Sequence, residues 1–399
     1  MHGVTVRRLE IDDALWRRVV SSSPYATPFH HPDVVTSVAV AMGRETKGWG
    51  AWLEGELVGG IFVLHSPSAR LTPVSAGAYN GPLLRDFPTK FRSSNDRYSS
   101  EVVTALCEAI RSEHSPIELR MVPGTADVRA LVAAGWQLRP SFTYLVDIAD
   151  LGQAWEAIDT NRKRLIRRAQ RLGYGISEVT CPTGTCPTGT CPTANEPSGR
   201  SICQPSESFV GQTIEETGVK IETYNDSVAN DVERLHRLQE QGYGLPGDVD
   251  LKGWRELLRR TLGQGTVRLF VARSRDGQVV AFQLTAAPDP VASAATSGGA
   301  RVAANLLTGA CPEHLDSGVN GLLRWRVFER LGEAGFREFD LNGARPGAAG
   351  RFKASFGGKL VERWELIHRG QPSHGRTLQR FVRHLARRIG NKFVPTIKR

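Results

Sequence analysis

Hydrophobic residues form two similar series of short runs along the chain. Apolar runs within 48–66 flank the turn sequence EGE, and apolar runs within 266–290 flank RDG, so each stretch predicts a β-hairpin. Each hairpin is followed by a third short run, a helix and a strand, with the helices at 99–113 and 318–334 and the strands at 116–122 and 336–342. Each series then closes with a helix-like turn and a last strand. The matching order predicts an internal duplication, in which each copy is an α/β unit built around a mixed sheet.

The stretch between the two copies, 149–173, contains no proline and predicts a helix throughout. On a helical wheel four arginines fall within one arc of about 100°: Arg164, Arg167, Arg168 and Arg171. The other side carries Leu165, Ile166, Ala169 and Leu172. The apolar face can anchor the helix to the body, and the basic face is either a solvated surface or a contact for an anion.

A pentamer, CPTGT, repeats and then degrades within 181–218, where Pro, Gly, Ser and Thr dominate. Such a segment cannot form a core, and we expect a disordered loop thrown out from a hairpin between strand-like runs at 174–179 and 219–224. Its cysteines are Cys181, Cys186, Cys191 and Cys203. Successive cysteines lack the paired CxxC spacing of structural zinc sites, and the segment has no histidine, so we expect no metal.

Positive charge is concentrated rather than uniform. The net charge is +10, but residues 371–399 hold eight Lys/Arg and no Asp/Glu, and residues 161–171 hold six Lys/Arg and no acid. Within the tail, 374–393 predicts a basic amphipathic helix. It suits an anionic membrane surface or nucleic-acid phosphates, and it equally suits docking on the body of the protein.

Composition indicates a globular protein of 399 residues, 40% hydrophobic and 23% charged, with mean hydropathy −0.28. No run approaches the ~18 apolar residues of a membrane span, and the first residues include acids where a signal peptide needs an apolar core. We therefore expect a cytoplasmic protein, with peripheral contact at the inner membrane face as a role for the tail. The expected domains are 1–150, 151–370 with the insert 181–218, and the tail 371–399.

Several sequence stretches together resemble a known group. Tandem copies of a strand–turn–strand–helix–strand unit resemble a duplicated GNAT fold. The stretches RKRLIRRAQRLG, TPFHHPDVV, RLQEQGYGLPGD, GLLRWRVFERLGEAGFREFDLNG and GRFKASFGG are similar to those of the FemABX aminoacyltransferases and the BioF2-like acetyltransferase domain proteins. The resemblance covers nearly the whole chain except the cysteine-containing insert and the tail. The fold class it implies is α/β, with tandem duplicated GNAT-like domains whose mixed sheets are flanked by helices.

The resemblance implies an N-acyltransferase that joins an activated acyl or aminoacyl group to an amine. In the FemABX branch the donor is aminoacyl-tRNA and the acceptor is a peptidoglycan precursor; in other GNAT branches the donor is acyl-CoA. We therefore expect no bound cofactor, one of those two donors, and a small-molecule or lipid-linked amine acceptor, such as a cell-envelope precursor. The long coiled-coil arm of some FemABX members is missing here, which weakens a specific assignment to peptidoglycan bridge synthesis.

The segment GRFKASFGG supplies the first site candidates. By the resemblance, Phe352 and Lys353 contact substrate, with the ammonium stabilising negative charge on a phosphate or on the oxyanion that forms during acyl transfer. Gly357 and Gly358 would let backbone approach a ligand closely. The alternative is a surface lysine on a turn, with its charged end in water.

Other candidates depend on position in the predicted elements. The arginines Arg164, Arg167 and Arg168 could contact a diphosphate, a sugar-phosphate or a tRNA backbone. Asp340 ends a predicted strand and could accept a proton from the amine, or it could cap the following turn, as Asp before Asn-Gly often does. Tyr243 is a candidate for the substrate pocket.

One GNAT feature is absent from the sequence. The coenzyme-A loop, Arg/Gln-x-x-Gly-x-Gly/Ala, does not precede either long helix, and DSGVNG at 316–321 offers a weaker anion site at a helix start. This disfavours ordinary CoA use without excluding it. The alternatives are an acyl-CoA-dependent acetyltransferase acting on an amino sugar of an envelope polysaccharide, and a non-catalytic binder of RNA or membrane surfaces.

Overall fold

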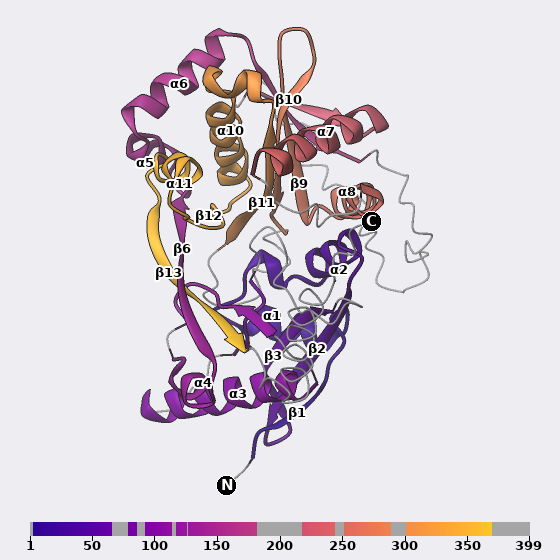
Figure 1. Cartoon of the computed structure of the whole chain (residues 1–399), viewed down its shortest axis with the longest axis vertical. Coiled ribbons are helices and arrows are strands. Elements are labelled where there is room, and N and C mark those ends of the chain that lie inside the picture. Colours follow the sequence, from indigo (N-terminus) through magenta and orange to yellow (C-terminus); the bar gives the residue numbers. More distant parts are fainter. Residues whose placement is uncertain are drawn as a thin grey trace, which may run out of the picture.

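The computed structural model describes residues 3–65, 79–85, 92–113, 117–125, 127–181, 218–243, 251–288 and 301–368. The predicted tail helix and most of the cysteine-containing insert, including Cys186, Cys191 and Cys203, lie outside these ranges. Within the described ranges, no helix is both long enough and apolar enough to cross a membrane. The described residues form two lobes, one above the other, and long strands run between them (Figure 1).

The first unit follows the predicted order. Its elements are β1 (Thr5–Arg8), α1 (Ala14–Ser22), η1 (Pro28–His30), α2 (Pro32–Ala41), β2 (Glu45–Leu53), β3 (Glu56–His65), β4 (Leu83–Leu84), α3 (Arg92–Glu113), β5 (Ile117–Arg120), α4 (Arg129–Ala133) and β6 (Gln137–Asp147). The hairpin turn between β2 and β3 contains Glu54 and Gly55, both with positive φ. A two-residue turn with positive φ at both positions matches the twist of the strands that it joins, which is why EGE predicted the hairpin correctly.

The second unit repeats this order after a linking region. The linking elements are α5 (Leu151–Ala157), α6 (Thr160–Arg171), β7 (Gly175–Thr180), β8 (Val219–Thr223), α7 (Asp226–Tyr243) and α8 (Leu251–Gln264). The repeat itself is β9 (Val267–Arg273), β10 (Val279–Ala286), β11 (Val302–Ala310), η3 (Pro312–Ser317), α10 (Val319–Glu333), β12 (Glu338–Asp340), α11 (Ala348–Ala354) and β13 (Lys359–His368). The predicted duplication of an α/β unit is confirmed.

Two details of the linking region were predicted wrongly. The single helix expected over 149–173 is two helices, because Asp159 lies between them and its carboxylate accepts hydrogen bonds from the first backbone N–H groups of α6. The hairpin expected around the insert is absent, because β7 and β8 pair in parallel. Parallel neighbours need a crossover connection rather than a tight turn, so the insert connects opposite ends of the two strands.

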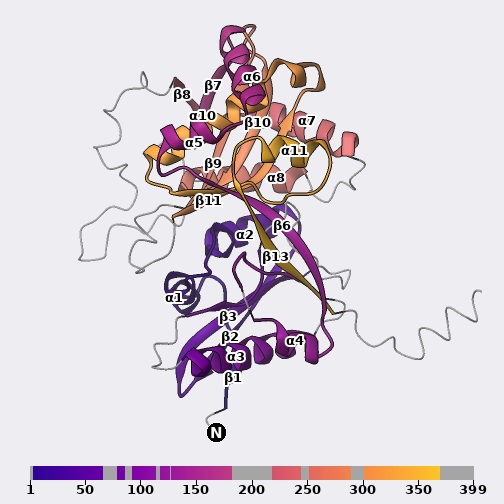
Figure 2. The ribbon, with the colours of Figure 1, turned by 90° about the vertical axis from the view of Figure 1, so that its left-hand side faces the viewer.

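The two units exchange their last strands. The smaller sheet has the order β1-β2-β3-β4, and the larger sheet has the order β5-β13-β6-β12-β11-β10-β9-β7-β8. Thus β6, which ends the first unit, pairs with β12 of the second, and β13, which ends the second unit, pairs with β5 of the first. The long ribbon of β6 and β13 crosses from one lobe to the other (Figure 2). Strands of residues 1–150 and of the later chain therefore share one sheet.

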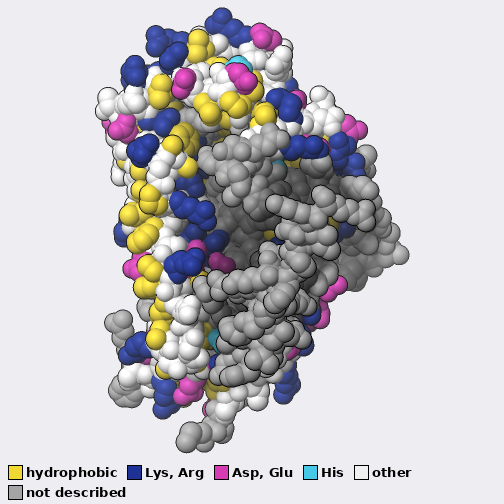
Figure 3. All heavy atoms as spheres, viewed as in Figure 1, with side chains coloured by type: hydrophobic (Ala, Val, Ile, Leu, Met, Phe, Trp, Pro, Cys, Tyr) yellow, Lys and Arg dark blue, Asp and Glu magenta, His cyan; other side chains and the backbone are white. Residues whose placement is uncertain are grey.

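The β6–β13 ribbon has two different faces. Side chains alternate across a strand, so Arg363 and Ser141 are on one face while Leu360 and Phe142 are on the other. Leu360 and Phe142 are 51% and 41% exposed, and hydrophobic side chains line the outer edge of the molecule there (Figure 3). Arg363, on the other face, is buried. The ribbon therefore presents a polar face to the junction of the lobes.

Candidate active site

A buried carboxylate lies where the two units meet. Asp340 ends β12 and is 2% exposed. Its Oδ2 accepts a hydrogen bond from the hydroxyl of Tyr79, which precedes β4 in the first unit, at 2.5 Å. Its Oδ1 accepts from the Thr143 hydroxyl of β6 at 2.5 Å and from the backbone N–H of Asn342 at 2.7 Å. The bond from Asn342 is the turn-capping contact that was one of the two roles expected for Asp340.

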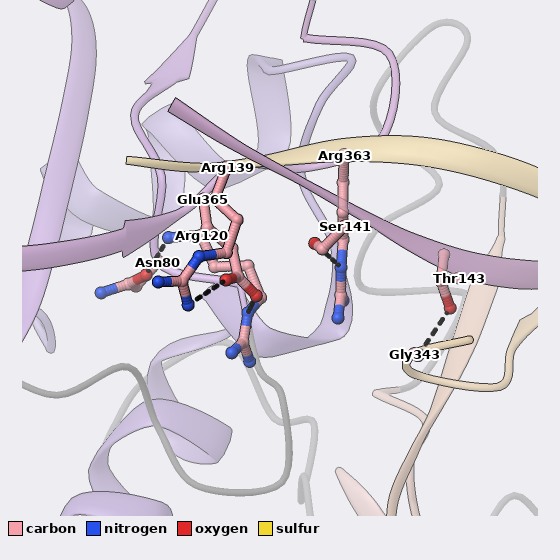
Figure 4. A network of polar contacts seen from close by, with 8 residues as sticks. All are labelled: Asn80, Arg120, Arg139, Ser141, Thr143, Gly343, Arg363 and Glu365. Atoms are coloured by element: carbon pink, nitrogen blue, oxygen red, sulfur yellow. Dashed lines mark hydrogen bonds and ion pairs between the residues drawn. The ribbon is translucent and has the colours of Figure 1, made fainter. Parts of the chain in front are cut away.

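The turn after β12 is shaped by Asn342 and Gly343, with φ of 54° and 100°. Asparagine tolerates the left-handed region, and glycine adopts it without steric cost. The Gly343 N–H donates to the Thr143 hydroxyl at 2.8 Å, which ties the turn to β6 (Figure 4). The carbonyl oxygens of both turn residues are thereby held in fixed directions.

Lys353 reaches this turn from α11. Its Nζ donates to the carbonyl oxygens of Asn342 and Gly343 at 2.8 and 2.9 Å. The helix is anchored by Phe356, which is fully buried against Phe328 of α10 with ring centroids 5.6 Å apart. The ammonium is half-buried beside Asp340 rather than free in solvent, so the alternative of a surface lysine does not describe this geometry.

Burial, together with the neighbouring guanidinium of Arg324, lowers the pKa of Lys353 to about 8, while Asp340 opposes this shift. Arg363 and Arg345 add weaker repulsion. A lysine in this range changes its charge close to neutral pH, which is a frequent property of functional groups.

Two more arginines are buried around Lys353. Arg324 of α10 is 3% exposed, and its Nε and Nη1 have no hydrogen-bond partner among the described residues. Burial lowers its pKa to about 9. Arg363 of β13 is 5% exposed, lies 5.2 Å from the ring centroid of Tyr79, and donates from Nε to Ser141 at 3.0 Å. The junction therefore holds more buried positive than negative charge near Asp340.

A separate ion pair closes the far end of the polar face. Arg120 of β5 donates from Nε to Glu365 of β13 at 3.3 Å, and Arg139 lies 3.9 Å from the same carboxylate (Figure 4). The Asn80 side chain accepts from the Arg120 backbone N–H at 2.8 Å. Glu365 is thus neutralised by its own arginines and does not balance the charge around Lys353.

The side chains of Phe352 and Lys353 have different surroundings. Phe352 is half-buried, with the Arg162 guanidinium 4.4 Å from its ring centroid, and it lines a pocket of about 360 Å³ together with Arg162, Arg351 and Ser355. Arg162 donates to Ser355 at 2.9 Å. Phe352 therefore borders this pocket, while Lys353 bonds the turn after β12.

The predicted glycines contact the protein itself. At Gly357, with φ of 74°, a Cβ would lie 2.4 Å from the carbonyl oxygen of Ala157; at Gly358 it would lie 2.9 Å from that of Leu145. The close backbone approach is present, and its partners are α5 and β6. It locks the end of α11 onto the body and so fixes the position of Lys353.

The remaining candidates do not gather at the junction. Arg164, Arg167 and Arg168 are exposed on α6, opposite its buried residues Ile166 and Ala169, so the predicted amphipathic pattern is present. Tyr243 is the last residue of α7, and its side chain lies outside the described part. No cluster of His, Cys, Asp or Glu within the described residues could hold a metal ion.

Sequence reasoning missed the partners of Asp340 and Lys353. Arg324 had a visible signal, because it is a charged residue in the apolar run GLLRWRVF of a helix that is buried on several sides. Tyr79, Thr143 and Arg363 had none: they come from distant segments that only the exchange of strands brings together.

Replacing Tyr79 by Phe should destabilise the protein by about 1–3 kcal/mol, because Oδ2 of Asp340 would lose its donor while remaining buried. Burial raises the pKa of Tyr79 well above its usual value. The hydroxyl therefore stays protonated at all ordinary pH values and can donate its hydrogen bond to Asp340. Urea unfolding of Tyr79→Phe measures the effect, and Tyr144→Phe, at a half-buried position of β6 outside this network, is the control. Equal stability of the two variants would show that the hydrogen bond from Tyr79 to Asp340 does not stabilise the fold.

Comparison with known proteins agrees with the observed order of helices and strands. Residues 213–354 match the model of the acetyltransferase (GNAT) domain. Among solved structures the chain is similar to FemX, with a TM-score of 0.56 and 12% identity, covering 90% of this chain and 96% of that chain. It is also similar to the C-terminal domain (DUF2156) of a putative lysylphosphatidylglycerol synthetase from Agrobacterium fabrum, with a TM-score of 0.50 and 13% identity, covering 90% of this chain and 93% of that chain. No curated protein matches the sequence. The predicted GNAT fold, of the kind found in the FemABX group, is confirmed.

Proposed function

Because the chain is a GNAT-fold acyltransferase whose fold resembles that of FemX, we propose that it transfers an acyl or aminoacyl group from an activated donor to an amine at the junction of its two lobes. The observation that carries this proposal is the placement of Lys353. An ammonium has three N–H donors, and two of them bond to the carbonyls of Asn342 and Gly343. Within the described part of the chain no residue takes the third, and we propose that it bonds the substrate.

The role we propose for Lys353 is electrostatic. When the amine attacks the donor carbonyl, the carbonyl oxygen becomes an oxyanion, and a fixed cation in a largely buried site stabilises it without reorganising. The contacts to the turn hold the ammonium in place before the reaction begins. Phe352 and the end of α11 keep the helix in position from the other side.

For Asp340 we propose a positioning role rather than that of the general base. Its two oxygens already accept hydrogen bonds from Tyr79, Thr143 and Asn342, so taking the proton of the amine would require one of these donors to leave. Its negative charge also favours the charged form of Lys353. The carboxylate thus fixes the turn and keeps the ammonium charged.

For the donor we favour aminoacyl-tRNA over acyl-CoA. CoA-dependent GNAT enzymes hold a pyrophosphate at a helix start, and here the start of α10 is covered by α6. A Cβ at Gly318 would lie 2.3 Å from the carbonyl oxygen of Leu165, and a Cβ at Gly321 would lie 3.2 Å from side-chain atoms of Arg162 and Ile166. The exposed arginines of α6 offer phosphate contacts for a polynucleotide donor. Acceptors of the cell envelope suit the same chemistry.

The test is a direct transfer assay. The protein is incubated with aminoacyl-tRNA or with acetyl-CoA, each with a panel of amines that includes a UDP-linked muropeptide and amino sugars, and the amine pool is scanned by mass spectrometry. An added aminoacyl mass supports the favoured donor, and an added acetyl mass supports the CoA-dependent alternative. RNA binding with steep salt dependence and no transfer from either donor would contradict the proposal and favour a non-catalytic binder.

Transfer, expressed per unprotonated molecule of the amine acceptor, should fall as the pH rises above about 8. Below this value Lys353 is charged and can stabilise the oxyanion; above it the neutral amine predominates and the electrostatic contribution is lost, by about tenfold per pH unit. The measurement is kcat/KM of the reacting pair from about pH 6 to about pH 10, divided by the unprotonated fraction of the acceptor amine, because kcat/KM then reports groups of the free enzyme. A value that keeps rising through the alkaline range would contradict the role of the charged lysine.

A further inference from the structure

The polar face of the β6–β13 ribbon holds a buried arginine that is only partly used. Arg363 donates from Nε to Ser141, but its Nη1 has no hydrogen-bond partner among the described residues. A buried guanidinium N–H without an acceptor costs free energy, and native proteins rarely leave one unpaired without a reason. The side chain of Arg363 points to the same side of the ribbon as that of Thr143, which contacts Gly343 (Figure 4).

The surrounding charges do not neutralise Arg363. No ion pair within the described ranges includes Arg363, Arg324 or Lys353 through a contact of 4 Å or less. Asp340 favours the charged form of Lys353, and both of its carboxylate oxygens already accept hydrogen bonds from neutral donors. Buried charges in proteins are normally paired, so this excess of positive charge favours an anionic ligand.

The turn leaves a space between two of these cations. A Cβ placed on Gly343 would lie 3.6 Å from Nη2 of Arg363 and 4.0 Å from Nζ of Lys353, and no other described atom outside the chain neighbours of this glycine comes within 4 Å. The φ of 100° at this position also favours glycine. The bare Cα thus opens a small space that two cations face.

We propose that this space beside Gly343 binds an anionic group of the amine acceptor, a carboxylate or a phosphate, through Arg363. The fork of N–H groups on a guanidinium matches the oxygen pairs of both anions. Nη1 of Arg363 has no hydrogen-bond partner among the described residues, and Nη2 lies 3.6 Å from the Cβ position of Gly343. Lys353 contributes charge at short range and keeps its third N–H for the reacting carbonyl. This inference rests on the proposed function, and it narrows the acceptor to an amine that also carries an anionic group.

Binding of small probes tests the site without knowledge of the natural acceptor. The probes are N-acetylglycine for a carboxylate, methyl phosphate for a phosphate, and N-acetylglycinamide as the neutral match, each measured by calorimetry or ligand-observed NMR at constant ionic strength. Wild type should bind at least one anion and show no binding of the amide. Equal binding of the amide would overturn the proposal, and this comparison needs no variant.

Single substitutions test whether the anion binds beside Gly343 and Arg363. Arg363→Met should weaken the preferred anion at least about tenfold, because a bidentate charged contact is lost. Gly343→Ala should weaken it as well, because its methyl group would occupy the space. Arg139→Met is the matched control, an arginine of the same ribbon whose side chain is 60% exposed, and it should bind as wild type does. Unchanged binding by folded Arg363→Met, or an equal loss in Arg139→Met, would overturn the proposal.

Paired acceptors separate this inference from the proposed function. Glycine and glycinamide present a primary amine with and without a carboxylate, and aminoethyl phosphate supplies the phosphate arm; rates are compared per unprotonated amine, because the three amino groups differ in pKa. Preferred acylation of an anionic amine by wild type, lost in Arg363→Met, supports both. Equal transfer to charged and neutral amines keeps the acyltransferase and overturns the anion site. Specific anion binding without transfer from any donor supports the anion site and contradicts the proposed function.

Discussion

Lys353→Met should lower kcat/KM for acyl transfer by about 10²–10³-fold, the usual cost of removing one donor that stabilises an oxyanion. Methionine keeps most of the length and the apolar stem of lysine, so packing around α11 is largely retained. The loss should appear mainly in kcat, because the contribution we propose is made to the transition state rather than to the bound substrates. Steady-state kinetics of the reacting donor–acceptor pair give this value.

The matched control for this prediction is Lys359→Met. Lys359 is an exposed lysine at the start of β13, a few residues from Lys353, and its loss should leave the rate unchanged. Circular dichroism of both variants checks that the fold is retained. Lys353→Met with wild-type kinetics would refute the proposed role of the ammonium, and an equal loss in the control would indicate a general effect of removing positive charge.

Gly357→Ala should destabilise the protein by about 2–5 kcal/mol. Alanine is strained at φ of 74°, at a cost of about 1–2 kcal/mol, and its Cβ would lie 2.4 Å from the carbonyl oxygen of Ala157. Because that neighbour is backbone, it cannot rotate away as a side chain could, and overpacking adds a further 1–3 kcal/mol or so. Urea unfolding measures the change in free energy.

Gly277→Ala separates strain from crowding. Gly277 has a similar φ of 81°, but nothing lies within 4 Å of its Cβ position, so its substitution should cost only the strain. If both variants lose the same stability, the contact between the end of α11 and α5 is not tight, and the placement of Lys353 would lose its support. A larger loss for Gly357→Ala confirms the close approach.

Local sequence signals predicted most of the elements, because each depends on nearby residues. The EGE turn gave β2 and β3, since a two-residue turn with Gly55 determines its own geometry. The apolar and basic faces of α6 followed from helical periodicity. The prediction of a hairpin around the insert was wrong because the composition of a strand does not determine how it pairs. The sequences of β7 and β8 suit a parallel and an antiparallel pair equally, and the two strands are parallel.

The site could be predicted only in part. The peculiar composition around Lys353 marked a functional candidate, and Asp340 could be placed at a strand end. The contacts of Asp340 with Tyr79 and Thr143 join residues 261 and 197 positions apart in the chain, and no local pattern encodes such distances. The same is true of Arg363, whose inward position depends on the register of β13 against β6.

The sequence by itself determined the duplicated α/β unit, the order of its helices and strands and the lysine between two phenylalanines, because these depend on periodicity, turn chemistry and composition within a few residues. Only the tertiary structure decided that β6 and β13 change places between the units, and with that which polar side chains are buried together. Strand pairing is chosen by the fit of whole faces, so the site at the junction arises from packing between distant segments rather than from any one motif.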